Sequence, residues 1–489
     1  MITLASILCL SLSVVPNAGA SFPSGKLDVA LDAIRSEYIS ADLHFIASDD
    51  LGGRDTPSAG LRTAARFIRA RLMRLGFAPG ARDGFFYTYE LGWLQANLAE
   101  CGVTLESAEL GQSSWELGRG YYLERAGDFA DQEVSGPVIY GGDGGRGDVG
   151  ELALEGKWVL LRDRGRSLRL SSRRLRESGA SGMLVVPAED YSGKDYDKRF
   201  ERVLSSLETG RARHLDPSGE RAAAPEPGFP VLYLDRMAAA ELLAGRKLAE
   251  LQLGAELGVE FTERRRLVEP DGRIDVENVC GLWPGSDPEL KNEVLIVSAH
   301  YDHVGTSGGE IYNGADDNGS GTCGMLALAE ALEAHGPLRR SVLLMWVSGE
   351  EKGLWGSEAW NAAPYLPAGY RAVADINIDM IGRNAPDELF VTPTRKLGPA
   401  HNGLVRLAQE LAASEGFGPL KNADAYYRRS DHYNFIRAGI PAAFLFADVH
   451  ADYHKPTDTV EKIDFDKIRR VTRLVLRMLA GLQADELDI

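Results

Sequence analysis

From about Asp275 onward, strand-like apolar runs alternate with helix-like segments, and this alternation restricts the fold more than any other feature of the chain. The runs are EVLIVSAH, SVLLMWVSG, AVADINIDM and PAAFLFA. Between and after them, apolar residues at helical spacing predict helices over residues 320–335, 401–415 and 466–482. Strands that alternate with helices form a largely parallel sheet covered on both faces. We therefore predict a three-layer α/β/α sandwich around a mostly parallel mixed sheet.

The chain has 489 residues, which is more than one hydrophobic core usually holds. The sequence pattern of residues 101–261 differs from that of the region after Asp275. Short β-like runs such as GKWVLLRDRG and FPVLYLD alternate there with short helical stretches. We predict that residues 101–261 form a smaller, inserted mixed α/β domain. The main domain would then consist of residues 21–100 and 262–489.

Three finer predictions concern segments outside the alternating region. Residues 26–46 and 61–75 carry apolar residues at helical spacing and are predicted to be helices. The stretch 197–227, inside the predicted insert, is polar and rich in arginine, and we predict a long loop there.

The N-terminus resembles an export signal. An apolar run from Ile2 to Val15 ends in Ala18-Gly19-Ala20, which is the small-residue pattern of a cleavage site. We expect residues 1–20 to be a signal peptide, the mature protein to be periplasmic or secreted, and no membrane insertion after its removal. The three cysteines beyond this segment are too few for a disulfide framework.

The composition is that of an ordinary globular protein, with 44% hydrophobic and 26% charged residues. The formal net charge is −17. Such an acidic balance argues against nucleic acid and anionic membrane surfaces as partners.

Acids and histidines follow each of the predicted strands. Ligands of open α/β sheets bind beyond the carboxyl ends of the strands, so these side chains are predicted to meet at one edge. They are His300, Asp302 and His303 after the first run, Glu350 and Glu351 after the second, and Asp379 in the third, with Asp316 and Asp317 in the loop NGADDNGSG and His450, Asp452 and His454 near the end.

Each of these residues has a structural explanation by itself, but their conjunction predicts a metal centre. His300 alone is as well explained as a hydrogen-bonded core histidine, and Glu350-Glu351 as a solvated pair. Asp379 lies in an apolar run, where an unpaired carboxylate would be costly. Two histidines with three or more carboxylates suit zinc. Five ligands suit two ions about 3.5–4 Å apart that share one bridging carboxylate.

The motifs SAHYDHVG, NGADDNGSG, SGEEKGLWGS, NIDMIGR, SDHYNF and DYHKPTDT resemble those of the co-catalytic di-zinc aminopeptidases. This family includes bacterial leucyl aminopeptidases, glutamate carboxypeptidase and the catalytically inactive transferrin receptor ectodomain. The segment LHFIASDDLGGRDTPSAGLRTAARFI is similar to the N-terminal part of such enzymes, and residues 101–261 resemble the protease-associated domain that many members carry. The likeness covers nearly the whole mature chain.

The resemblance implies a role for each matching position. His300 and Asp379 would hold one zinc ion, Glu351 and His454 the other, and Asp317 would bridge the two. It also implies three catalytic residues: Glu350 as general base, Tyr453 as the group that stabilises the oxyanion, and Asp302 as the residue that orients His300. A further implication is a cis peptide bond between Asp317 and Asn318.

The implied activity is hydrolysis of peptide bonds at a chain end, with an aminopeptidase favoured and a peptide or protein with a free terminus as substrate. Three alternatives remain open. A carboxypeptidase or dipeptidase would use nearby arginines, such as Arg383, Arg428 or Arg429, to hold a substrate carboxylate. A glutaminyl cyclase-like enzyme would keep one zinc ion. A receptor-like module would not be catalytic, which the complete ligand set argues against. The sequence leaves the side-chain preference and the oligomeric state open.

Overall fold

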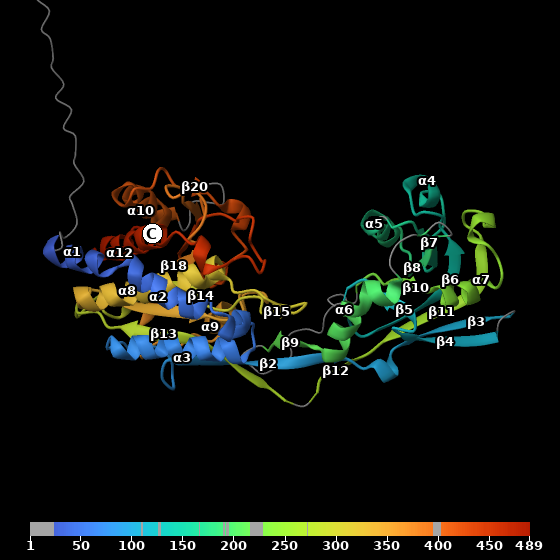
Figure 1. The fold of residues 1–489 in the computed structure, drawn as a ribbon, viewed down its shortest axis with the longest axis horizontal. Helices are drawn as coiled ribbons and strands as arrows, with labels where there is room; N and C mark the ends of the chain where they lie inside the picture. Colours follow the sequence, from blue (N-terminus) through green and yellow to red (C-terminus); the bar gives the residue numbers. More distant parts are fainter. Residues whose placement is uncertain are drawn as a thin grey trace, which may run out of the picture. The chain divides into compact units, whose positions relative to one another are not determined.

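The computed structural model describes residues 24–108, 111–125, 129–165, 167–188, 191, 195–215, 228–270, 272–394 and 402–489. The predicted signal peptide lies outside the described residues. The chain forms two compact units, Met1–Tyr89 with Asp275–Ile489, and Glu90–Ile274 (Figure 1). Among the described helices, none combines the length and the apolar character needed to cross a membrane.

The larger unit is built around a mixed sheet whose four central strands, β17, β14, β18 and β21, run parallel. β13 pairs antiparallel with β17 at one side, and β19 pairs antiparallel with β21 at the other. The main strands are β13 Ile274–Trp283, β14 Glu293–His300, β17 Ser341–Val347, β18 Arg371–Asp379, β19 Phe390–Thr392 and β21 Ala442–Phe446, with short strands β1 Ala78–Pro79, β15 Thr306–Ser307, β16 Glu310–Ile311 and β20 Lys421–Asn422. The prediction of a mostly parallel mixed sheet is confirmed.

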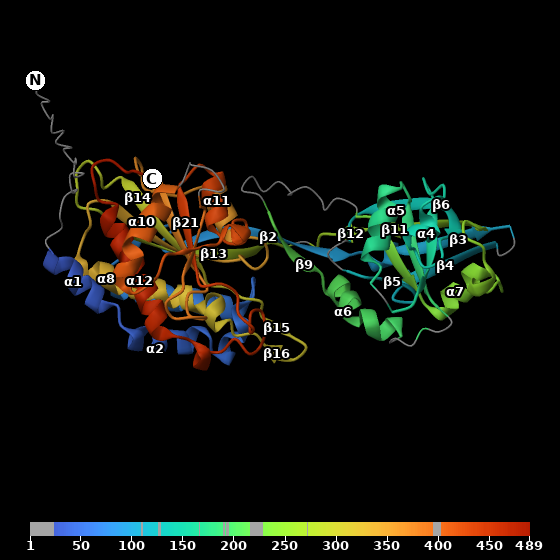
Figure 2. The same ribbon diagram turned by 90° about the horizontal axis from the view of Figure 1, so that it is seen from above.

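Helices cover both faces of this sheet. On one face α8 packs against β14 and is itself covered by α1, α2 and α12, while α10 and α12 lie side by side (Figure 2). On the other face, α9 and α11 pack Trp360 and Phe435 against Leu343 and Ile296 of the sheet. The helices are α1 Ser24–Ala33, α2 Ser36–Ile46, α3 Ala59–Arg74, α8 Gly321–His335, α9 Trp355–Ala362, α10 Asn402–Ala412, α11 His432–Arg437 and α12 Phe465–Gly481.

The apolar sequence of α8 explains its central place. Nearly all its residues from Gly321 to Ala331 are buried, and a helix that is apolar all round must be covered on every side. Strand β14 is likewise buried along almost its whole length, as expected of a strand between two helical layers.

The smaller unit contains a closed barrel with the strand order β10-β5-β4-β3-β11-β6-β7-β8. Its elements are β2 Phe86–Ala96, which begins in the larger unit, β3 Gly102–Ser107, β4 Gly111–Leu117, β5 Gly120–Leu123, β6 Gln132–Tyr140, β7 Trp158–Asp163, β8 Gly182–Pro187, β9 Arg211–His214, β10 Val231–Leu234, β11 Glu256–Arg265 and β12 Leu267–Val268, with helices α4 Arg146–Val149, α5 Arg169–Glu177, α6 Tyr196–Thr209 and α7 Arg236–Leu243. The predicted insert, residues 101–261, lies within this unit.

Two local predictions are wrong. The stretch predicted as a loop from residue 197 contains α6 and β9, because Tyr196, Phe200 and Leu207 recur on one helix face and enter the core of the barrel unit. The single helix predicted over residues 26–46 is two helices, since Arg35 between them has extended backbone angles.

Candidate metal centre and active site

The parallel strands deliver the predicted side chains to one edge of the sheet. β14 ends at His300, and Asp302 and His303 follow it. β17 is followed by Glu350 and Glu351, and β18 ends at Asp379. Because β17, β14, β18 and β21 are parallel, their carboxyl ends lie at the same edge.

Asp317 stands at the centre of the cluster. It lies in the turn Ala315–Ser320 before α8, and the peptide bond between Asp317 and Asn318 is cis, which confirms the prediction. Its Oδ1 is 3.4 Å from Nε2 of His300. Its Oδ2 is 3.0 Å from Nε2 of His454. One carboxylate therefore offers a different oxygen to each of two groups of side chains.

We call His300, Asp317 and Asp379 the first donor group. Nε2 of His300 is 3.2 Å from Oδ1 of Asp379. Nδ1 of His300 donates a hydrogen bond to the backbone carbonyl of Asp302 at 3.2 Å, which leaves Nε2 free to bind a cation. Ser430 donates to Oδ2 of Asp379 at 2.8 Å and so fixes that carboxylate.

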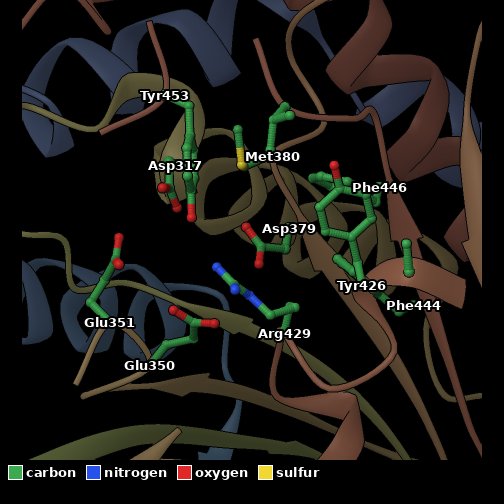
Figure 3. A pocket seen from close by; sticks show the side chains of 12 residues that line it. Asp317, Glu350, Glu351, Asp379, Met380, Tyr426, Arg429, Phe444, Phe446 and Tyr453 are labelled. Carbon is green, nitrogen blue, oxygen red and sulfur yellow. The ribbon is translucent and has the colours of Figure 1, made fainter. Parts of the chain in front are cut away.

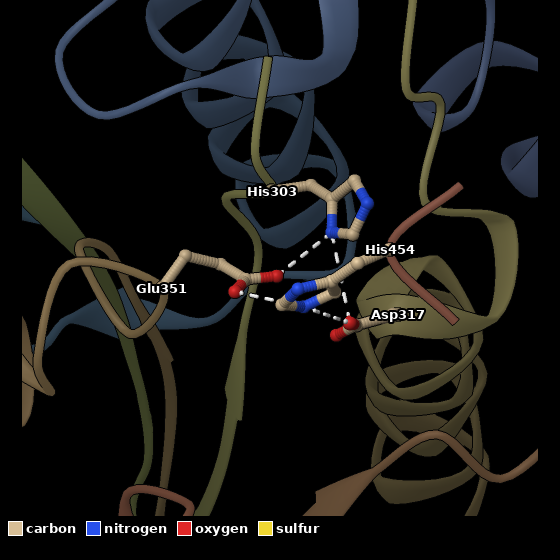
Figure 4. Close-up of side chains that lie close together, drawn as sticks. All are labelled: His303, Asp317, Glu351 and His454. Atoms are coloured by element: carbon tan, nitrogen blue, oxygen red, sulfur yellow. Dashed lines mark ion pairs between the residues drawn. The ribbon is translucent and has the colours of Figure 1, made fainter. Parts of the chain in front are cut away.

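We call His303, Asp317, Glu351 and His454 the second donor group (Figure 4). Nε2 of His454 lies 3.1 Å from Oε2 of Glu351, and Nδ1 of His303 lies 2.8 Å from Oε1 of Glu351. In both donor groups, the ligand atoms lie within 4.8 Å of one another.

The two groups fit metal ions chemically. Oδ2 of Asp317, Oε1 of Glu351 and Nε2 of His454 are buried and have no hydrogen-bond partner among the residues that the structure describes. Buried polar atoms without partners are rare and costly, and metal coordination satisfies them. Nitrogen and carboxylate oxygen donors together suit zinc. The structure brings together all five predicted metal ligands.

Glu350 lies beside the first donor group, with its Oε2 4.0 Å from Nε2 of His300. Burial raises the pKa of Glu350 well above its usual range, and the negative charges of Glu351 and Asp379 raise it further against the opposing effect of His300. A carboxylate with a raised pKa is suited to accept and return a proton near neutral pH.

Asp302 supports both His300 and Glu350. Its Oδ1 is 3.6 Å from Nδ1 of His300 and accepts a hydrogen bond from the backbone N–H of Glu350 at 3.2 Å. Its Oδ2 accepts from the hydroxyl of Thr56 at 3.1 Å. The hydrogen bond from His300 goes to the main chain of Asp302, so this residue positions the imidazole through its backbone as well as its carboxylate.

Tyr453 lines a pocket together with Asp317, Glu350, Glu351 and Asp379. Its ring stacks on that of His454, with the centroids 3.9 Å apart. Its hydroxyl points between Asp317 and Asp379 (Figure 3). Burial raises the pKa of Tyr453, so the hydroxyl keeps its proton and can donate a hydrogen bond.

The pocket encloses about 270 Å³ and has two chemically different sides. Asp317, Glu350, Glu351 and Asp379 form the acidic side. Tyr426, Phe444 and Phe446 form a mostly apolar side across from Glu350 and Glu351, and the guanidinium of Arg429 lies near Glu350 and Asp379 (Figure 3). Met380 and Val449 also line the pocket.

The two aspartates of the glycine-rich loop have separate functions. Asp316 faces away from the donor groups: its Oδ1 accepts from the backbone N–H of Gly382 at 2.7 Å, and its Oδ2 lies 3.3 Å from His450. Asp458 accepts from the backbone N–H groups of both Asp316 and Asp317. Asp316 therefore anchors the loop, whereas Asp317 faces the site.

Sequence reasoning missed the contributions of His303, Ser430 and Arg54. His303 and Ser430 lie in the motifs SAHYDHVG and SDHYNF, but the sequence predicts no role for either residue. Arg54 is fully buried, and its guanidinium donates to the backbone carbonyls of Tyr301 and Gly314. The only sequence sign of it is its place in the glycine-rich segment DDLGGRD.

The known proteins to which this chain is similar include peptidases. Residues 278–479 match the model of peptidase family M28. A probable leucine aminopeptidase of Arthroderma benhamiae is 30% identical over 200 residues, which are 39% of this chain and 54% of that protein. Aminopeptidase YwaD of Bacillus subtilis is 30% identical over 191 residues, 37% of this chain and 40% of that protein. The chain spans about half the length of the first relatives it matches.

Two solved structures share the fold. The aminopeptidase from Aneurinibacillus sp. strain AM-1 has a TM-score of 0.55 at 20% identity. The superposed part makes up 95% of this chain and 98% of that one. The zinc aminopeptidase BSAP from Bacillus subtilis has a TM-score of 0.51 at 19% identity and covers 92% and 96%. The likeness places the larger unit in the zinc exopeptidase fold.

Proposed function

Because residues 278–479 match the model of peptidase family M28, we propose that the protein is a zinc-dependent aminopeptidase that removes residues from the N-terminus of peptides. The observation that carries this proposal is Asp317, which presents one oxygen to each donor group. We propose two zinc ions per chain, one held by His300, Asp317 and Asp379, the other by Asp317, Glu351 and His454. The names of the similar proteins, which include leucine aminopeptidases and a zinc aminopeptidase, support this reading.

Zinc supplies Lewis acid chemistry when bound, because it polarises a carbonyl and makes water acidic enough to react near neutral pH. The residues of this chain do the rest. Glu350 takes a proton from the attacking water and returns it to the amine that leaves as the C–N bond breaks. The hydroxyl of Tyr453 donates a hydrogen bond to the oxyanion that forms on the carbonyl oxygen. His300 and Asp302 hold this geometry in place.

The apolar side of the pocket determines which residue is removed. Phe444 and Phe446 pack with Met380 in one apolar cluster and lie across from Glu350 and Glu351 (Figure 3). An apolar pocket beside the reacting centre favours a large apolar side chain. We propose that the preferred N-terminal residue is leucine, phenylalanine or a similar residue, whose free amine is attracted to the acidic side.

The position of Arg429 favours a second candidate function, that of a carboxypeptidase or dipeptidase. Arg429 lines the pocket, and Figure 3 shows its guanidinium directed between Glu350 and Asp379. A guanidinium can hold a substrate carboxylate through paired hydrogen bonds.

One panel of substrates separates the two candidates. Leucine p-nitroanilide and free dipeptides are compared with N-acetylated leucine p-nitroanilide and N-acetylated dipeptides. An aminopeptidase hydrolyses the substrates with a free amine and leaves the acetylated ones intact. Hydrolysis of the acetylated dipeptides would instead establish the carboxypeptidase, and hydrolysis of the free dipeptides without leucine p-nitroanilide would establish the dipeptidase. If no substrate in the panel is hydrolysed, the proposed function is wrong.

We also propose that residues 1–20 direct export, on the strength of their apolar run and small-residue cleavage pattern.

A further inference from the structure

His303 occupies a place that the five predicted ligands do not account for. It follows β14 three residues after His300, and its side chain is fully buried. Both nitrogens of its ring lack a hydrogen-bond partner among the described residues. Buried polar groups without partners are rare in folded proteins, and each of them calls for an explanation.

The atoms that face His303 are of the types that bind metal ions. Nδ1 lies 2.8 Å from Oε1 of Glu351 and 3.8 Å from Oδ2 of Asp317. The ring of His454 stands nearly perpendicular to that of His303, with centroids 5.5 Å apart, and its Nε2 faces the same two carboxylates (Figure 4). Two imidazoles and two carboxylates therefore converge on one point from different elements.

The spacing of these atoms matches a shared cation. Four ligands at the Zn–N and Zn–O distances of a tetrahedral site are roughly 3.3 Å apart. The ion-pair distances in the second donor group are 2.8 and 3.1 Å to the two oxygens of Glu351, and 3.0 and 3.8 Å to Oδ2 of Asp317. Although Nδ1 of His303 is close to Glu351, neither atom of that pair has a hydrogen bond of acceptable geometry among the described residues. Two ligands of one metal ion lie close together without a hydrogen bond between them, because each directs its lone pair at the ion and not at the other ligand.

The surrounding backbone holds the imidazole of His303 in place. Gly314 has a φ of +55°, and a Cβ at this position would lie 2.5 Å from Cγ of His303, so only glycine leaves room for the ring. The backbone N–H of His303 donates to the carbonyl of Arg54, whose guanidinium in turn donates to the carbonyl of Gly314. Arg54 thereby links the two backbone segments that enclose the ring.

We propose that His303 is a fourth protein ligand of the second zinc position, an inference that rests on the proposed two-zinc function. The second position then has a full tetrahedral set from the protein: His303, Asp317, Glu351 and His454. The first position has only three protein ligands, namely His300, Asp317 and Asp379. Zinc sites with four protein ligands are characteristically structural, and sites with three keep a place for water or substrate. The second ion is therefore held more tightly and is released last.

The test replaces His303 by asparagine, whose side-chain amide nitrogen reaches about as far as Nδ1 and is able to donate a hydrogen bond to Glu351. Asparagine is a poor zinc ligand, so the variant separates coordination from hydrogen bonding. The matched control is His335→Asn, which changes a buried histidine at the far end of α8, away from both donor groups. Zinc content is measured by elemental analysis after dialysis, and both dissociation constants by competition with a chromophoric chelator.

We expect the wild-type protein and His335→Asn to bind two zinc ions of unequal affinity. His303→Asn should lower the zinc affinity of the tighter site by a factor of about 10² or more. Loss of a residue that only orients a ligand already lowers metal affinity 10–100-fold, and loss of a ligand should cost at least as much. The weaker site should change little. A folded His303→Asn variant that binds both ions with wild-type affinity would overturn the inference.

Further measurements distinguish the possible failures. X-ray absorption of the wild-type protein loaded with two zinc ions should count three imidazole ligands, and a count of two would refute the role of His303 even if the variant does not fold. Wild-type protein that binds no zinc would refute the proposed function too. Wild-type protein with two zinc ions and peptidase activity, matched in zinc affinity by His303→Asn, would refute only the inference.

Discussion

The two donor groups that share Asp317 are built differently. His300 and Asp379 are the last residues of β14 and β18, so the hydrogen bonds of the sheet fix them, and Ser430 secures Asp379 from behind. The other residues of the second group, His303, Glu351 and His454, follow the strands in loops. The side chain of His454 is 35% exposed, whereas that of His300 is 1% exposed.

This difference indicates how one site can combine rigidity with access. In the first group, regular secondary structure fixes the positions of the side chains, so that three ligands are sufficient. The second depends on loops, and it compensates with a larger number of ligands and with a loop anchor in Arg54. We therefore expect the two positions to respond differently to metal removal and to substitution.

Removal of zinc should have the largest effect. Treatment with a strong chelator should abolish hydrolysis of leucine p-nitroanilide, because water is activated only with the metal present. On stepwise addition of zinc, the first equivalent should fill the second donor group with little activity, and the second equivalent should restore the rate. Full activity of the metal-free protein would contradict the account, and a linear recovery would remove the distinction between the positions.

The adjacent glutamates should separate chemistry from metal binding. Glu350→Gln keeps the size of the side chain and removes its basicity, so kcat should fall by a factor of about 10² or more with both ions retained. Glu351→Gln should weaken the second position, and its activity should recover in part at high zinc concentration. Zinc analysis and kcat of both variants provide the test. If Glu350→Gln is the variant that loses metal, the two roles are reversed.

Ser430→Ala should affect only the first donor group. The hydroxyl donates to Oδ2 of Asp379, and loss of a group that orients a ligand typically costs 10–100-fold in metal affinity. We expect the weaker zinc dissociation constant to rise by about 10-fold while the tighter one stays unchanged. Ser414→Ala, at an exposed serine near the end of α10, serves as the control. Loss of the tighter ion in Ser430→Ala would show that the order of affinities is the opposite of the proposed one.

The apolar side of the pocket belongs to neither donor group, so changes there should leave zinc binding intact. Phe446→Ala should lower kcat/KM for leucine p-nitroanilide relative to alanine p-nitroanilide by about 10-fold, since small differences in apolar contact are worth about 1–3 kcal/mol. Zinc content should equal that of the wild type. An unchanged preference for leucine would place the specificity pocket elsewhere.

The smallest effect concerns His432, a buried histidine that contrasts with His303. His432 stacks on Phe444 at a centroid distance of 4.7 Å. Burial lowers the pKa of His432 to about 3, whereas an unfolded histidine titrates near 6.5. Between these values the unfolded state binds more protons, so stability falls as the pH decreases below about 6.5.

His432→Phe should remove this dependence. Relative to the variant, the wild-type protein should lose about 0.7 kcal/mol of unfolding free energy between pH 7 and pH 6. Urea unfolding of both proteins at the two pH values measures the difference. The same loss in wild type and variant would mean that His432 does not titrate as proposed.

The fold was predictable because its determinants are local and repeated. The continuous apolar runs of β14, β17 and β18 identify buried parallel strands, and the residues directly after them identify the edge where the site lies. The helix α6 was missed because its polar residues outnumber Tyr196, Phe200 and Leu207, whose common face becomes evident only when the core is known.

The site was predictable where a residue's role follows from its motif. Nothing in a single sequence distinguishes a second histidine after a strand from a core histidine, so the role of His303 required the position of Gly314 and the distance to Glu351. The same limit applied to Arg54, whose hydrogen bonds span parts of the chain that are far apart in sequence.

The two-zinc site with a shared Asp317 can be tested directly by anomalous X-ray diffraction at the zinc edge from crystals of the zinc-loaded protein. We predict two zinc ions about 3.5–4 Å apart. Asp317 should lie between them with one oxygen on each, and Nδ1 of His303 should lie about 2.1 Å from the ion next to His454. A single ion, or two ions that do not share Asp317, would contradict the proposed two-zinc site.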